Sequence, residues 1–202
     1  MRAADPPAVD HGALATALGT GSLYALVMGD TWFRLAAPIR DLHSTASGTR
    51  AHGCLRVEHG HHRLARIIAR TFPLPPPGVA TPTELSVMAL DDGERWQRAF
   101  GATRVETHQS WNGVDLVERY GALEFRFRLH ASEGRLVYRQ RDAALRLFAF
   151  PLRLPGYLAP HIEASEEAVA PRRVKIAVSI TIPMIGLLIA YDGTIDVVET
   201  VA

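Results

Sequence analysis

Apolar and polar residues alternate along most of the second half of the chain. Apolar side chains occupy every second position of 123–129 and again of 174–182, with charged or hydroxyl-bearing side chains at several of the positions between. Because successive side chains of a strand point to opposite faces, this period predicts strands with one buried face. From Thr83 to the C-terminus the pattern predicts about eight strands.

Glycine-containing pairs separate the predicted strands. The Asp-Gly pairs at 92–93 and 192–193 and the Asn-Gly pair at 112–113 are typical of tight hairpin turns, because glycine tolerates positive φ. Tyr-Gly at 120–121 and Glu-Gly at 133–134 mark further turns. Consecutive hairpins build a meander, which curls into a barrel or a twisted sheet to hide its edges.

The first third of the chain has helical spacing instead. The apolar stretch 13–28 predicts one or two short helices, and 31–43 predicts another, with Pro38 as a kink or break. A strand is expected at 50–60, followed at 61–72 by a helix with one apolar face.

These elements predict a β-dominant α+β fold. We expect N-terminal helices packed on a strongly curved antiparallel sheet or open barrel, built as a meander. One domain is expected at 13–198, with a disordered tail at 1–12 and a short tail at 199–202. The proline-rich connector 73–78 marks the change from helix-containing to almost wholly β structure.

Composition and charge narrow the function classes. The chain has 202 residues, 48% of them apolar and 21% charged, as in a soluble globular protein. A net charge of +1 gives no reason to propose nucleic acid or an anionic membrane as partner. The longest uncharged run, 176–191, is shorter than the roughly 20 residues of a spanning helix. A transmembrane segment is not expected, and the cytoplasm is the expected location.

The sequence offers no recognisable cofactor or metal motif. Cys54 is the only cysteine, so we expect it to be a small buried hydrophobe. His59, His61 and His62 are close in sequence, but the adjacent pair cannot converge on one point from a regular helix or strand. We expect these histidines to lie in a solvated loop and at the start of the following helix. Neither a metal nor a cofactor is expected.

The best functional indication is a mixed strand face at 94–100. Glu94, Trp96, Arg98 and Phe100 alternate and therefore point the same way. A carboxylate, an indole, a guanidinium and a phenyl ring make a poor dry core and an unusual solvent surface. This combination suits the wall of a ligand pocket.

Glu118 shares its strand face with Leu116 and Tyr120, which have apolar bodies. A carboxylate on an inward face is costly unless it is paired or used as an acid or base. Arg98 and Arg126 are the candidate partners on neighbouring strands. The alternatives are that the pair fixes strand register, or that a bulge breaks the alternation.

Several segments occur in a characteristic order along the chain. They are Leu42-His43, RLARIIARTFPLPPPG (63–78), ERWQRAF (94–100), VERYG (117–121), LPGYLAP (154–160), PMIG (183–186) and YDG (191–193). Taken together, these segments resemble one known family, the bacterial domain of unknown function 4166, and the resemblance extends from about Ser22 to Val198. The resemblance implies no activity, because the family has none assigned, but some members of the family follow a saccharopine-dehydrogenase-like nucleotide-binding domain.

Three functional hypotheses follow. We favour binding of a hydrophobic or amphipathic small molecule, of lipid or acyl type, in a β-lined cavity where Arg98 holds an acidic group. The candidate ligand-binding residues are Glu94, Trp96, Arg98, Phe100, Glu118 and Arg126. The first alternative is a cyclase or isomerase with Glu118 or Glu94 as the acid or base, its pKa raised by apolar surroundings. The second is an accessory domain that partners a saccharopine-dehydrogenase-like protein.

Overall fold

The structure is a computed structural model that describes residues 22–44, 48–72, 74–147 and 150–198. The tails expected at 1–12 and 199–202 lie outside the described residues, as does the start of the helical stretch expected at 13–28.

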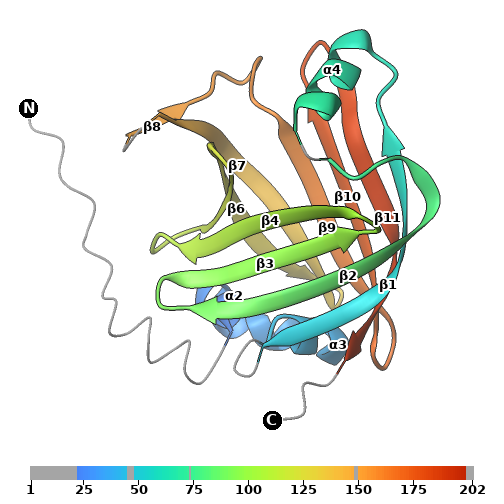
Figure 1. Cartoon of the computed structure of the whole chain (residues 1–202). Coiled ribbons are helices and arrows are strands. Elements are labelled where there is room, and N and C mark those ends of the chain that lie inside the picture. The colour runs from blue at the N-terminus through green and yellow to red at the C-terminus, as the bar shows by residue number, and fades with distance from the viewer. Residues whose placement is uncertain (1–21, 45–47, 73, 148–149, 199–202) are drawn as a thin grey trace, which may run out of the picture.

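Strands dominate the described part of the chain, as predicted (Figure 1). All strand pairs are antiparallel, and ten strands rather than about eight follow the proline-rich connector within the described residues. The strands are β1 (Thr49–His59), β2 (Gly78–Leu90), β3 (Gly93–Phe100), β4 (Thr103–Trp111), β5 (Leu116–Tyr120), β6 (Leu123–Ser132), β7 (Arg135–Leu147), β8 (Phe150–Arg153), β9 (His161–Ala170), β10 (Arg173–Ile182) and β11 (Gly186–Val198).

The sheet closes into a barrel instead of remaining open. Its order is β6-β5-β4-β3-β2-β1-β11-β10-β9-β7-β8, and an additional pairing of β6 with β7 joins the two sides. The long strand β7 makes this closure: one edge pairs with β6, while the other pairs with β9 near its start and β8 near its end. Closure removes the exposed edges that an open meander leaves unpaired.

Short helices cover one end of the barrel. They are α2 (Leu23–Met28), the 3-10 helix η1 (Gly29–Arg34) and α3 (Ala37–Leu42), which lie behind β1 and β2 in the lower part of Figure 1. The Ser22 hydroxyl caps α2 by accepting from the Tyr24 amide. Pro38 lies in the first turn of α3, so it begins a new helix where its missing N–H costs nothing. We call this the closed end.

The remaining described helix, α4 (Arg63–Thr71), lies at the opposite end and connects β1 to β2 along the chain (Figure 1). His62 caps it by accepting from the Leu64 amide. We call this the open end. In the described residues, no helix is long and apolar enough to cross a membrane.

The hydrophobic core joins the closed-end helices to the barrel interior. Leu23, Ile39 and Leu42 are fully buried and pack in one cluster with inward side chains such as Leu116 and Phe127. Burial of each such side chain stabilises the fold by about 1.5–3 kcal/mol. The helices therefore fill this end of the barrel with side chains.

Four of the five predicted glycine turns are present; the fifth is wrong. Asp192-Gly193 lies within β11 and not in a turn. A Cβ at Gly193 would lie 2.4 Å from the Cys54 carbonyl oxygen of the paired strand. Close approach of two backbones, rather than chain reversal, explains this glycine. Cys54 itself is exposed, contrary to expectation.

Candidate functional site

A cavity of about 380 Å³ occupies the barrel between the closed-end core and the open end. Every described strand except β8 contributes to its wall, together with α4 and the segment 154–160. Phe72 and Leu158 line it and are also exposed to solvent, so the cavity reaches the surface at the open end. The volume lies at the lower side of the ~300–1,000 Å³ range of small-molecule pockets.

The wall is mostly aliphatic and aromatic. The alternation predicted for 174–182 gives β10 one apolar face. The side chains on this face that line the cavity are Ile176, Val178, Ile180 and Ile182. From β6, Leu123, Phe125 and Phe127 face the same space. Polar side chains therefore stand out wherever they reach it.

The mixed face of β3 lies against this cavity along most of its length. Trp96, Arg98 and Phe100 line the wall. Glu94 lies deeper, fully buried, where its carboxylate accepts from the Leu23 amide at 3.1 Å and from Trp96 Nε1 at 3.0 Å. Glu94 thus joins α2 to β3 and holds the indole that forms part of the cavity wall.

Arg98 is the guanidinium within the cavity wall. Its Nη1 donates to Thr107 Oγ1 at 2.9 Å and its Nη2 donates to Glu118 Oε1 at 3.4 Å. The guanidinium carbon also lies 5.0 Å from the centre of the Trp96 ring system, in cation–π range. Burial lowers the pKa of Arg98, but the negative charge of Glu118 and the nearby phenols of Tyr191, Tyr24 and Tyr138 together outweigh this and raise the pKa overall.

Glu118 projects from β5 into the same cavity. Of its two candidate partners, Arg98 is the one that pairs with it. The two strands are not adjacent, because β4 runs between them, and the long side chains bridge it. Both side chains keep almost a fifth of their surface accessible, facing the cavity.

A second polar chain, which the sequence did not predict, lies nearby. His43 Nε2 lies 2.7 Å from Glu166 Oε2, and Tyr138 Oη lies 2.8 Å from Glu166 Oε1. Tyr138 Oη is also 3.1 Å from Tyr24 Oη, which donates to Gln109 Oε1 at 2.8 Å. Tyr138, Glu166 and Gln109 reach the cavity wall.

Burial dominates the acid–base properties of these tyrosines. It raises the pKa of Tyr138 well above the ordinary value, and the nearby charge of Glu166 raises it further. Burial and Glu166 act in the same direction on the pKa of Tyr24. Both phenols are therefore protonated at neutral pH and serve as hydrogen-bond donors.

Glu166 could have been found from the sequence. Glu166 belongs to the acidic segment 163–167, whose composition is typical of a solvated surface. Glu166 is nevertheless only 6% exposed. Its alternate neighbours Ile162, Ala164 and Ala168 are apolar, which marks an inward face. Tyr24 and His43 come from the closed-end helices, and no periodicity predicts where a helix end meets a barrel.

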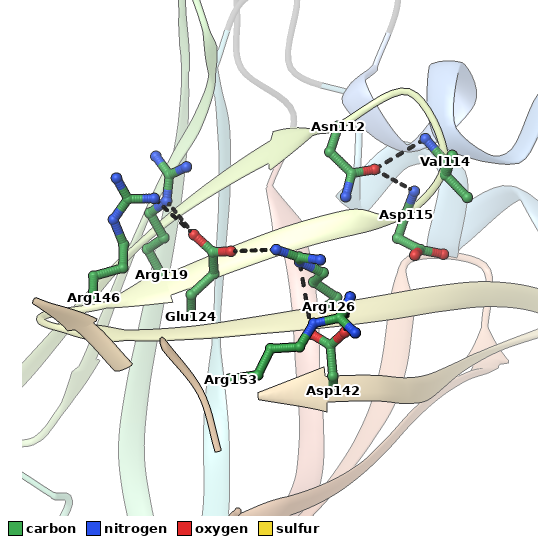
Figure 2. A network of polar contacts seen from close by, with 9 residues as sticks. All are labelled: Asn112, Val114, Asp115, Arg119, Glu124, Arg126, Asp142, Arg146 and Arg153. Carbon is green, nitrogen blue, oxygen red and sulfur yellow. Dashed lines mark hydrogen bonds and ion pairs between the residues drawn. The ribbon is translucent and has the colours of Figure 1, made fainter. Parts of the chain in front are cut away.

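Arg126 lies away from the cavity. It alternates on β6 with the inward-facing Phe125 and Phe127, so its side chain points to the other face. Figure 2 shows it between Glu124 and Asp142, with contacts of 3.3 and 3.6 Å. Its surroundings are those of an ion-pair network.

The three histidines at the end of β1 and just after it point to different surroundings. His59 Nε2 contacts the Pro75 carbonyl oxygen at 2.6 Å, His62 caps α4, and His61 is exposed. Among the described residues, no three His, Cys, Asp or Glu side chains are grouped to hold a metal ion.

Comparison with known proteins identifies the family. The model of the domain of unknown function DUF4166 matches residues 35–195, most of the chain. The chain belongs to this family. The match begins later and ends slightly earlier than the resemblance seen in the sequence, and it extends from α3 into the last strand, β11. No curated protein and no solved structure gives a significant match.

Proposed function

We propose that this DUF4166 barrel binds one amphipathic small molecule inside its cavity. The polar group of the molecule lies against Arg98 and Glu118, and its apolar body extends toward the open end. The observation that carries the proposal is the cavity itself: one guanidinium–carboxylate pair in an otherwise largely apolar wall. Few polar groups in an apolar cavity are typical of sites that orient a hydrophobic ligand.

The charges near Arg98 favour a neutral polar group on the ligand. Arg98 already faces Glu118, and Glu166 lies on the same cavity. An acidic ligand would add a further negative charge beside these carboxylates, at a cost that low dielectric increases. A hydroxyl or amide group would accept from Arg98 and donate to Glu118.

Native mass spectrometry of the purified protein, followed by solvent extraction, tests whether a molecule is carried. Calorimetric titration then compares a long-chain alcohol with the fatty acid of equal length. We expect one bound molecule and tighter binding of the alcohol. Arg98→Gln should weaken binding about tenfold, because a hydrogen bond to a charged group is lost.

Arg95→Gln is the matched control. Arg95 lies on the same strand, but its side chain is 41% exposed. Its Nε lies 3.9 Å from Glu106 Oε1, which is a long ion pair. Its replacement should leave affinity unchanged. A protein that carries nothing and binds neither probe, or equal losses in the two variants, would contradict the proposal.

A second candidate is an isomerase or cyclase that acts on such a molecule. The supporting observation is that Glu118, Glu166 and Tyr138 line one largely apolar cavity, so a carboxylate base and a phenolic donor face the same ligand. Glu118→Gln separates the two: an enzyme loses turnover of the carried molecule, whereas a binding protein shows no turnover in either form and changes only in its affinity. The cytoplasmic location and the saccharopine-dehydrogenase-like partner stay predictions.

A further inference from the structure

The helix at the open end leaves apolar side chains in solvent. Leu64 and Ile67 of α4 are 50% and 57% exposed, and only Ala65 of this helix is buried. Ile68 and Phe72 continue from the helix onto the cavity wall. The surface of α4 is therefore continuous with the inside of the barrel.

The same helix is purely basic. Arg63, Arg66 and Arg70 are exposed, and α4 contains no acidic residue. No ion pair joins any of the three to another described residue. Unpaired arginines beside exposed leucine and isoleucine are typical of a helix that lies in an anionic membrane interface.

Other segments at this end add to the apolar surface. Tyr157 and Leu158, in the connection from β8 to β9, are 64% and 57% exposed, and Met184, in the β10–β11 turn, is 93% exposed. Figure 1 shows α4, this connection and this turn at one end of the barrel. We call Leu64, Ile67, Tyr157, Leu158 and Met184 the apolar rim.

Charged side chains of both signs lie at the closed end: Asp91, Asp92 and Glu133 in its turns, and Arg34 and Arg40 in its helices. The open end differs in its cluster of exposed apolar side chains, which lie beside the arginines of α4. An anionic surface would attract the arginines of α4, and the apolar side chains beside them would orient the barrel mouth toward it.

We propose that the apolar rim and the arginines of α4 dock on an anionic lipid surface, so that the ligand passes between bilayer and cavity. This inference rests on the proposed binding function, because it states where the ligand is collected or delivered. A lipid surface satisfies both features at once: its acyl region takes the rim and its headgroups pair with the arginines. The open mouth between the rim residues lets an apolar molecule avoid water.

Vesicle co-sedimentation of the full chain tests the proposal. The vesicles contain phosphatidylcholine alone or with about 30 mol% phosphatidylglycerol, which supplies the anionic surface. We expect binding to the anionic vesicles only, weakened by added salt. Leu64→Asp with Ile67→Asp should reduce binding about tenfold, and Arg66→Gln or Arg70→Gln about fivefold each.

Phe33→Asp is the control. Phe33 is 73% exposed at the closed end, so its replacement should not change vesicle binding. Absence of binding to anionic vesicles, equal binding to neutral ones, or an equal loss in Phe33→Asp would overturn the proposal. Titration with the long-chain alcohol in the absence of vesicles keeps the two proposals apart, since the Leu64→Asp, Ile67→Asp protein should still fill its cavity.

Discussion

The neighbouring strands β5 and β6 hold carboxylate–arginine contacts on both faces of the barrel wall, and the two sets differ in completeness. On the outside, Glu124 accepts from Arg119, Arg126 and Arg146 at 3.0–3.3 Å and is almost fully buried (Figure 2). On the inside, Glu118 has one contact to Arg98, at 3.4 Å.

This difference separates a structural role from a ligand-binding role. The outer carboxylate has its lone pairs occupied by protein donors, so it has little capacity for a ligand. The inner pair retains accessible surface on a cavity and spare hydrogen-bonding capacity. We therefore expect substitutions outside to change stability and substitutions inside to change binding.

The largest effect should come from Glu124→Gln. It removes the charge that three arginines share and should lower the free energy of unfolding by about 3 kcal/mol, as for a broken buried ion pair. Urea denaturation measures this loss. Affinity for the cavity ligand should not change; a variant as stable as the wild type would show that the outer network is dispensable.

Acid should abolish this difference between Glu124→Gln and the wild type. Burial acts to raise the pKa of Glu124, but hydrogen bonds from Arg146, Arg119 and Arg126 outweigh it and hold the pKa below its usual range. Because the folded pKa is depressed, the stabilisation is complete above the unfolded pKa of about 4.3 and is lost as pH falls through the folded pKa. Denaturation curves from pH 7 downward should converge only below about pH 4.3.

Arg126→Gln should have a smaller effect, about 1 kcal/mol. Glu124 keeps Arg119 and Arg146, while Asp142 keeps its contact to Arg153 at 3.3 Å. Thermal denaturation measures the loss, and calorimetric titration should give the wild-type affinity. A weakened affinity would restore the ligand-binding role that the sequence suggested for Arg126.

Glu118→Gln should cost least, less than about 1 kcal/mol, because a single long contact is altered and glutamine still offers an oxygen to Arg98. Its effect should appear in ligand affinity instead. If unfolding measurements show a loss as large as that of Glu124→Gln, the inner pair fixes strand register and the contrast between the faces fails.

Alternation along single strands predicted much of this arrangement. It placed Trp96, Arg98 and Phe100 on one face and Glu118 on the inward face of its strand, because a period of two is a local property. The same rule, applied to Arg126 between Phe125 and Phe127, would have placed it on the outer face. The need of an inward carboxylate for a partner suggested Arg126 beside Glu118, but alternation is the stronger constraint on a regular strand.

Closure of the barrel could not be predicted from the pattern of single strands, because it depends on β7 pairing along both of its edges. Glu166 and Tyr138 meet only through this closure, and Tyr24 and His43 reach them from the helices that fill the barrel end. Residues brought together by distant pairings carry no common spacing along the chain. The chain of contacts from His43 to Gln109 therefore required the structure.

The pairing of β1 with β11 has a consequence for folding. It joins Arg50 to Val198, close to the two limits of the described barrel. Such non-local pairing slows folding, because the entropy of closing the long loop between the two strands opposes their contact. While the chain is being synthesised, β1 can pair only with β2 until the last strand emerges, and the ligand cavity does not yet exist. A ligand added during refolding should therefore bind only after this final pairing, and should slow unfolding more than it speeds folding.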